Sequence, residues 1–324
     1  MVIVNAELKL VWEMSTKLDN TYSRNAVVPR RGFAMGLMVA CSVVISFGGL
    51  IIRNMEDADA WQLNFYRSVA LIGAISVILV FQYRQRTVSH VRRIGRPGLI
   101  GGVMLATAGI CFLQALTHTT VANTLFTMSA IPFITAALAR IFLKERLQLI
   151  TLTTMFVAAI GIFVMIAEGV VIGSIYGNAM ALITAICFSS FTVIIRCYRE
   201  IDMLPTLLVS GLLIGLAGLL MRGDDLAIPL NDILLSFLWG GLLSGFANWT
   251  FIVATRHLVA AEVTLFMLLE FALGPVWVWL FVGETPTWET LLGGAMIMAA
   301  VAVLASVELR RANRRLRRGR PSPT

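Results

Sequence analysis

The sequence predicts an all-α integral membrane protein, and two observations carry this prediction. Ten separate apolar runs occupy almost all of the chain between Phe33 and Val307, and each is close to the roughly 20 residues that a transmembrane helix needs. The composition agrees, since 58% of the residues are hydrophobic and only 14% are charged. Barrel strands would be about half as long and would alternate strictly, so the runs are expected to be helices.

The ten expected spans follow one another with short connections. Their ranges are 33–52, 61–81, 98–117, 122–143, 149–167, 175–195, 204–221, 233–253, 260–282 and 288–307. They form two halves, residues 33–167 and 168–307, between an N-terminal tail of residues 1–32 and a basic C-terminal tail of residues 308–324. The N-terminal tail lacks the apolar core of a signal peptide, so we expect no cleavage there.

Charge sets the expected orientation, because Lys and Arg accumulate in the short cytoplasmic loops of membrane proteins. The two tails and the even-numbered loops hold 23 of the 26 Lys and Arg residues. The odd-numbered loops hold only Arg53 and Arg222, against nine acidic residues. Both termini are therefore expected in the cytoplasm. The net charge of +8 follows membrane sidedness and not a soluble basic fold, which argues against nucleic-acid binding.

An internal repeat emerges when the chain is aligned with itself. Residues 46–53, SFGGLIIR, match residues 189–196, SSFTVIIR, at an offset of 143. A second offset, 139, pairs His118 with His257 and Glu145 with Glu284. The repeat unit holds five spans, an odd number, so the second copy enters the membrane from the opposite side. Such inverted duplications recur in secondary transporters, with a substrate site between the halves.

Three motifs resemble the EamA-like family of the drug/metabolite transporter superfamily. They are NFYRS from Asn64, IPFITAALARIFLKERL from Ile131, and LLEFALGPVWVWLFVGETP from Leu268. The resemblance covers roughly residues 34–306. It implies a ten-helix 5+5 inverted bundle whose central cavity is lined mainly by helices 1, 3, 4, 6, 8 and 9. The family's second half often reads Leu-Glu-Pro, whereas Phe271 follows Glu270 here and the proline comes later as Pro275. We therefore expect any helix kink to be displaced toward Pro275.

Glu270 is the proton-coupling candidate. It lies midway along the ninth expected span, and a carboxylate at bilayer depth is costly enough to be a functional candidate by default. Its expected role is proton binding or contact with a substrate amine, and the alternative is a structural hydrogen bond to a neighbouring helix.

Arg67 and Glu262 are expected to be structural. Arg67 lies about two turns into the second span, where carboxylates or carbonyls can anchor it or its head can snorkel outward. Contact with a substrate carboxylate is the alternative for Arg67. Glu262 begins the ninth span, where an acid stabilises the helix dipole.

The substrate-binding candidates are polar or aromatic residues on the helices that the resemblance assigns to the cavity. They are Ser42, Ser46, Phe47, Gln114, Met128, Ser129, Ser189, Thr192, Asn248 and Trp249. A pocket with aromatic walls and few hydrogen-bonding groups suits small amphipathic ligands. Helix packing is the alternative for each Ser and Thr, and it is the expected role of the pairs Gly98/Gly102, Gly211/Gly215 and Gly241/Gly245.

These observations favour a secondary carrier that exports amino acids or related small metabolites from a bacterial cell through its inner membrane. The alternatives are uptake or exchange of a larger metabolite, such as a nucleotide or S-adenosyl compound, and a non-transporting membrane sensor. No nucleotide-binding motif, hydrolase motif or metal-ligand spacing is present, so we expect no cofactor, no metal and no enzymatic activity. The expected partners are a small-molecule substrate and the lipid bilayer, and the working unit is left open between a monomer and a homodimer.

Overall fold

The computed structural model describes residues 31–56, 58–84, 87–119, 121–145, 148–166, 175–223, 225–283 and 287–318. The predicted N-terminal tail lies outside the described residues except for its last two positions, Arg31 and Gly32, which already belong to the first helix. Glu284 and the last six residues of the C-terminal tail also lie outside them.

The described residues are helical and contain no strand, which confirms the all-α class. Within the described ranges, six helical segments are long and apolar enough to cross a membrane. They are α3 (Ala60–Tyr83), α5 (Gly95–His118), α9 (Ile175–Cys197), Leu230–Thr255, Ala260–Phe281 and Trp288–Arg310. Four shorter apolar helices accompany them: Arg31–Ile45, α7 (Ile131–Phe142), α8 (Leu149–Ile166) and α10 (Thr206–Arg222).

Several long segments are built from shorter helices. Leu230–Thr255 consists of α11 (Leu230–Phe237), a π-helical stretch η3 (Leu238–Leu243) and α12 (Ser244–Thr255). Ala260–Phe281 comprises α13 (Ala260–Met267) and most of α14 (Leu269–Val282), and Trp288–Arg310 is part of α15 (Trp288–Arg318). The remaining short helices are α2 (Gly48–Arg53), α4 (Thr87–Arg93) and α6 (Val121–Met128). Helices thus occupy each of the ten ranges that the apolar runs predict, within a few residues at their ends except for α15, which continues past the predicted end at residue 307 to Arg318.

Three of these ranges hold a helix that breaks near its middle. The first breaks at Ser46–Phe47, the fourth at Ser129–Ala130, and the ninth at Leu268. At each break a backbone N–H donates to the carbonyl oxygen three residues earlier, and not four earlier as in an α-helix. At the ninth-span break this bond runs from Leu268 N to Leu265 O at 3.1 Å. In the ninth span the break lies at Leu268, two residues before Glu270, and α14 continues without interruption through Pro275, so a kink at Pro275 stays a prediction.

The start of α3 shows how local sequence positions a helix. The Asp59 carboxylate accepts hydrogen bonds from the backbone N–H groups of Trp61 and Gln62 at 2.8 and 2.9 Å. The Gln62 side-chain oxygen in turn accepts a hydrogen bond from the backbone N–H of Asp59 at 3.0 Å. This capping box satisfies amides that have no partner inside the helix.

The helices pack closely wherever glycine faces a neighbour. A Cβ at Gly211 or Gly215 of α10 would lie 2.7 Å from Ile72 or Ser68 of α3, and one at Gly102 of α5 would lie 2.6 Å from Val209. These contacts confirm the packing role expected of those glycines. Gly98 instead faces Ile94, one turn earlier in its own chain segment.

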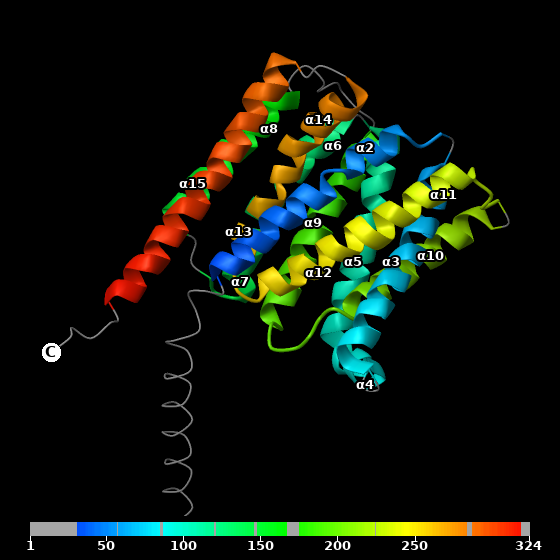
Figure 1. The fold of residues 1–324 in the computed structure, drawn as a ribbon. Helices are drawn as coiled ribbons and strands as arrows, with labels where there is room; N and C mark the ends of the chain where they lie inside the picture. Colours follow the sequence, from blue (N-terminus) through cyan, green and yellow to red (C-terminus); the bar gives the residue numbers. More distant parts are fainter. Residues whose placement is uncertain are drawn as a thin grey trace, which may run out of the picture.

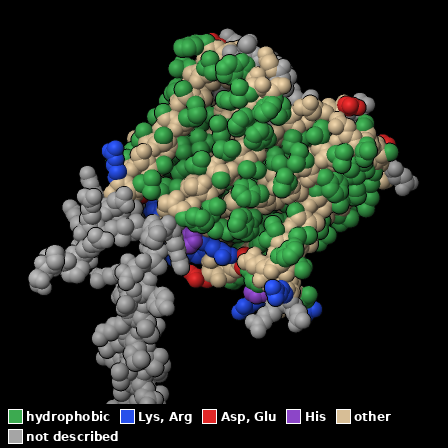
Figure 2. Space-filling view, viewed as in Figure 1, with side chains coloured by type: hydrophobic (Ala, Val, Ile, Leu, Met, Phe, Trp, Pro, Cys, Tyr) green, Lys and Arg blue, Asp and Glu red, His purple; other side chains and the backbone are tan. Residues whose placement is uncertain are grey.

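The bundle exposes many large apolar side chains, and hydrophobic side chains cover most of the face seen in Figure 2. The exposed apolar side chains include Phe81 at 81% and Leu220 at 74% exposure. A soluble monomer rarely exposes so much contiguous apolar surface, so this surface suits lipid. In this view Lys and Arg side chains gather toward the lower edge, and the first helix begins and α15 ends on that same side of the bundle (Figures 1 and 2). We call this side the basic end.

Candidate functional site

Glu270 lies in the first turn of α14, directly after the break at Leu268. Its side chain is partly buried, and its Oε2 atom is buried without a hydrogen-bond partner among the described residues. A buried carboxylate oxygen without a donor is unfavourable unless it binds a proton, a ligand or water. The break thus presents a carboxylate with unused bonding capacity inside the bundle.

The first helix and α2 pack against this part of the ninth span. Ser42 donates a hydrogen bond to the carbonyl oxygen of Phe266 at 2.8 Å, and Ser46 accepts one from the indole of Trp277 at 2.7 Å. Phe47 stacks on Trp277, with ring centroids 4.5 Å apart. Three substrate-binding candidates, Ser42, Ser46 and Phe47, are therefore brought to residues one turn before and two turns after Glu270.

The face of α14 that carries Glu270 is turned toward the first helix. A Cβ at Gly274, one turn after Glu270, would lie 3.9 Å from the carbonyl oxygen of Ser46. Residues four apart share a helix face, so the Glu270 side chain lies on the same face of α14 as Gly274. The carboxylate therefore belongs to the interface between the first and ninth spans.

The candidates of the fourth and sixth spans meet at the other central break. Ser189 of α9 donates to the carbonyl oxygen of Ile131, the first residue of α7, at 3.2 Å. Ser129, which is buried, lies in the break itself, and Met128 is the last residue of α6 before it. Thr192 instead bonds the carbonyl of Phe188 in its own helix at 2.9 Å, as a packing role would require.

The remaining candidates lie on α5 and α12. Gln114 is buried, and its amide nitrogen has no partner among the described residues. Asn248 donates to Ser244 O in its own helix at 2.8 Å, and Trp249 packs beside Phe246. Between α9 and α12, the rings of Phe188 and Phe251 pack against each other with centroids 5.5 Å apart.

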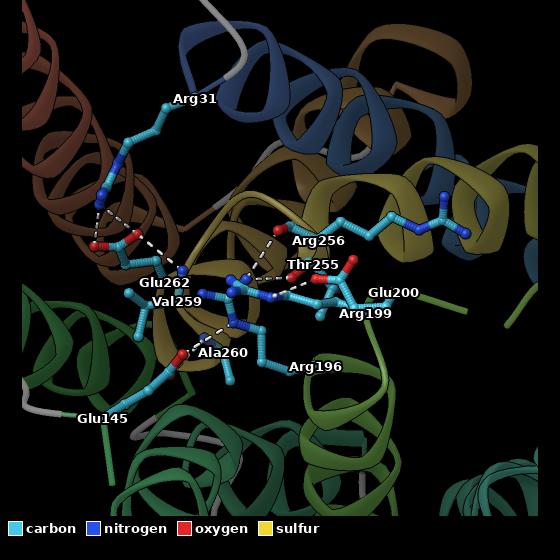
Figure 3. Close-up of polar contacts among 10 residues, drawn as sticks. All are labelled: Arg31, Glu145, Arg196, Arg199, Glu200, Thr255, Arg256, Val259, Ala260 and Glu262. Carbon is cyan, nitrogen blue, oxygen red and sulfur yellow. Dashed lines mark hydrogen bonds and ion pairs between the residues drawn. The ribbon is translucent and has the colours of Figure 1, made fainter. Parts of the chain in front are cut away.

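A network of ion pairs and hydrogen bonds lies at the basic end (Figure 3). Arg31 donates to both carboxylate oxygens of Glu262, at 2.7 and 2.8 Å, and pairs with Glu308 of α15 at 3.0 Å. Both acids are buried. Glu262 also accepts a hydrogen bond from the backbone N–H of Val259 at 3.4 Å, so it supports the start of α13 as expected. This part of the network links the first helix to the ninth and tenth spans.

Arg196 forms a second part of these polar contacts (Figure 3). It pairs with Glu145 at 2.9 Å and donates to the carbonyl oxygens of Thr255 and Arg256, both at 3.0 Å. Glu145 accepts in turn from Ala260 N at 3.4 Å. These bonds join the ends of α7, α9 and α12 to the start of α13.

Arg67 lies away from this network, at the wall of a small cavity. The cavity measures about 50 Å³ and is lined by residues of α3, α5, α10, η3 and α12. The guanidinium carbon of Arg67 lies 3.6 Å from the centroid of the Trp239 ring. No hydrogen bond or ion pair of Arg67 occurs among the described residues, so this cation–π contact anchors it in place of the expected carboxylate or carbonyls.

Reasoning from sequence missed several of these residues. Trp277 carries a signal, because it lies two turns after Glu270 on the same helix face. Trp239 and Arg31 carry none, since Trp239 is one of many apolar residues of its span and Arg31 belongs to a run of basic residues at the membrane boundary. Within the described part of the chain, no group of three His, Cys, Asp or Glu side chains is arranged to hold a metal ion.

Comparison with known proteins identifies the class. The model of the EamA-like transporter family matches the chain twice, over residues 32–167 and 175–306. The chain therefore belongs to the EamA-like transporter family, whose members are transporters and not enzymes.

Two curated relatives are both named pseudopaline exporter CntI, from Pseudomonas aeruginosa strains PAO1 and UCBPP-PA14. Each is 23% identical over 294 residues, which cover 83% of this chain and 94% of the relative. A solved structure titled only "Crystal structure of protein" has a TM-score of 0.73 at 17% identity and covers 87% of this chain and 99% of its own. This likeness shows a shared fold, and the family indicates a multi-pass membrane transporter with a small-molecule substrate.

Proposed function

We propose that this protein is a secondary active transporter that exports small amphipathic metabolites, such as amino acids or related compounds, through a bacterial inner membrane. One observation carries the proposal. A transporter-family model matches both halves of the chain, and a carboxylate with an unpartnered oxygen lies at a helix break where the two halves meet. The exporter names of the two bacterial relatives support the outward direction.

A ten-span, inverted 5+5 architecture underlies this proposal. The two family matches cover five expected spans each. The breaks at Ser129 and Leu268 are separated by the same offset of 139 that relates the two halves of the sequence. At each break a serine from the first span of one half, Ser42 or Ser189, donates to a carbonyl of the fourth span of the other half. Breaks at repeat-related positions, each contacted by a serine from the first span of the other half, favour two copies of one unit.

Both termini are assigned to the cytoplasm, because the described ends of the chain lie together at the basic end of the bundle (Figure 1). The ion pairs of Arg31, Glu262, Glu145 and Arg196 would then close the cytoplasmic side. They join helices of the first half to helices of the second, which must separate on that side to admit a substrate from the cytoplasm. In this account the network acts as the cytoplasmic gate.

Proton coupling is assigned to Glu270. In the exchange cycle a proton entering from outside neutralises this carboxylate and leaves toward the cytoplasm, while the substrate moves outward. The substrate itself would contact Ser42, Ser46, Phe47 and Trp277 beside Glu270, and the other polar and aromatic candidates of the central helices. A charged amine of the substrate and a proton would compete for the same carboxylate, which couples their movements.

The test is transport by the purified full-length protein in proteoliposomes. A panel of labelled amino acids and small metabolites is offered with an imposed pH gradient, and protein-free vesicles are the control. Saturable, gradient-driven movement of at least one small amphipathic compound is expected. Movement of nucleotides or S-adenosyl compounds alone would replace the proposal with the larger-metabolite alternative, and no movement of any compound would favour a non-transporting role.

A further inference from the structure

We propose that the cavity beside Arg67 is a binding site for a small monovalent anion, either a halide or a carboxylate group. The site lies between α3 and η3, apart from the residues assigned to the substrate and the proton. Its ligand chemistry follows from the side chains that line it.

The cavity holds a cation that has no carboxylate partner among the described residues. Arg67 contacts only the face of Trp239, at 3.6 Å, and its Nε atom is buried without an acceptor. An arginine keeps its charge in proteins. A cation–π contact offsets only part of the cost of removing such a charge from water. The site therefore favours a ligand with negative charge.

A second donor faces the same space. Asn64 is only 2% exposed, lines the cavity one turn before Arg67, and its amide nitrogen has no hydrogen-bond partner among the described residues. Ser68, the next polar residue on this face, already donates its hydroxyl proton to Phe65 O at 2.7 Å. Two side chains with an unused donor, one of them charged, therefore line the same cavity.

The cavity is large enough for the proposed ligand. A volume of about 50 Å³ accommodates a halide or a carboxylate group. The backbones that form the wall are in close contact, since a Cβ at Gly240 would lie 2.3 Å from the carbonyl oxygen of Arg67. Trp239 and Gly240 belong to the π-helical stretch η3, a type of distortion that is frequent at functional sites.

Trp239 supplies the readout, because an anion bound to Arg67 changes the charge over its ring. Tryptophan fluorescence of the full-length protein in nanodiscs is titrated with sodium chloride and with sodium acetate. The sodium salt of a bulky organic sulfonate, whose anion is neither a halide nor a carboxylate, keeps the ionic strength constant. We expect a saturable change in the wild type that is lost in Trp239→Phe, which removes the reporter but keeps an aromatic ring.

Two variants test whether the fluorescence change is caused by anion binding in the cavity beside Arg67. Asn64→Leu keeps Arg67 and removes one donor, so the apparent anion affinity should fall about tenfold, the value of a hydrogen bond to a charged group. Arg67→Gln should abolish saturation, and Asn231→Ala, at an exposed asparagine, should change nothing. A response that is linear in anion concentration, or equal in wild type and Asn64→Leu, would overturn the proposal and indicate a water-filled cavity.

The two sources of the anion are separated by competition. Chloride saturation that free amino acids do not reduce identifies a halide site. Saturation by acetate, with competition by an amino acid but not by its methyl ester, identifies the carboxylate of an organic solute. Either result supports the site, and neither depends on whether Glu270 couples protons or on whether the protein transports the solute tested.

Discussion

Arg31, the first described residue, bonds both carboxylate oxygens of Glu262, which lies 231 positions later in the chain. The contact joins the beginning of the first helix to the beginning of α13, and Glu308 adds a second acid to the same guanidinium. One arginine thus pairs with two buried acids, one on α13 and one on α15. The first two predictions concern the ion pairs of Glu262 and Arg196 at this basic end.

Glu262→Gln should destabilise the protein by about 2 kcal/mol, because it removes one partner of a largely buried ion pair. The measurement is the midpoint of thermal unfolding of the purified protein. Glu200→Gln is the matched control, since Glu200 is 88% exposed and pairs with Arg199 at 3.6 Å, a type of contact worth less than about 1 kcal/mol. Equal effects of the two changes would contradict a structural role for the Arg31–Glu262 pair.

Arg196→Gln should loosen the basic end without unfolding the bundle. The change removes the partner of Glu145 and leaves the carbonyl oxygens of Thr255 and Arg256 without their donor. Hydrogen–deuterium exchange should therefore become faster in residues 255–262, and Arg199→Gln, at a half-exposed arginine, should leave it unchanged. Unaltered protection in both variants would show that Arg196 does not hold the gate closed.

Gly240→Ala should be strongly destabilising. The added Cβ meets the backbone of Arg67 at 2.3 Å, so α3 and η3 must move apart, and overpacking of this kind costs about 1–3 kcal/mol. Gly73→Ala, on α3 with open space around its Cα, is the control and should unfold at the wild-type temperature or slightly above it. The thermal midpoints of the two variants check this, and similar midpoints would contradict the close α3–η3 contact.

Ser46→Ala should alter transport more than folding. It leaves the indole N–H of Trp277 without its acceptor at 2.7 Å while the stacking of Phe47 on Trp277 remains. The expected loss of stability is about 1 kcal/mol, whereas the apparent affinity for substrate should fall several-fold if the indole helps to line the binding site. Thermal unfolding and substrate titration in proteoliposomes measure the two effects, and an unchanged affinity would remove Ser46 from the candidate site.

The sequence predicts where the apolar helices lie, but it does not predict the helix break at Leu268 or the contact that Arg67 makes. The ranges of the apolar helices follow from length and hydropathy, since each run must satisfy its backbone inside the membrane. The break at Leu268 does not follow, because it depends on packing against the first helix through Ser42 and not on the nearby proline. The stacking of Arg67 on Trp239 joins residues far apart in the chain, and no local pattern encodes it.

Some candidate site residues can be recognised from the sequence and others cannot. Glu270 stands out in the sequence because a carboxylate is rare at bilayer depth, and the structure gives it a buried oxygen without a partner. For Ser and Thr the sequence cannot separate a ligand contact from packing, since their hydroxyls also bond the carbonyls of their own helix, as Thr192 does.

The most direct measurement is substrate transport in proteoliposomes with and without an imposed pH gradient, for the wild type, Glu270→Gln and the control Glu289→Gln. The account predicts that the gradient accelerates transport in the wild type and in Glu289→Gln, and that Glu270→Gln loses the gradient-driven component. Transport that ignores the gradient in all three proteins, or that keeps its full response in Glu270→Gln, would contradict proton coupling through Glu270.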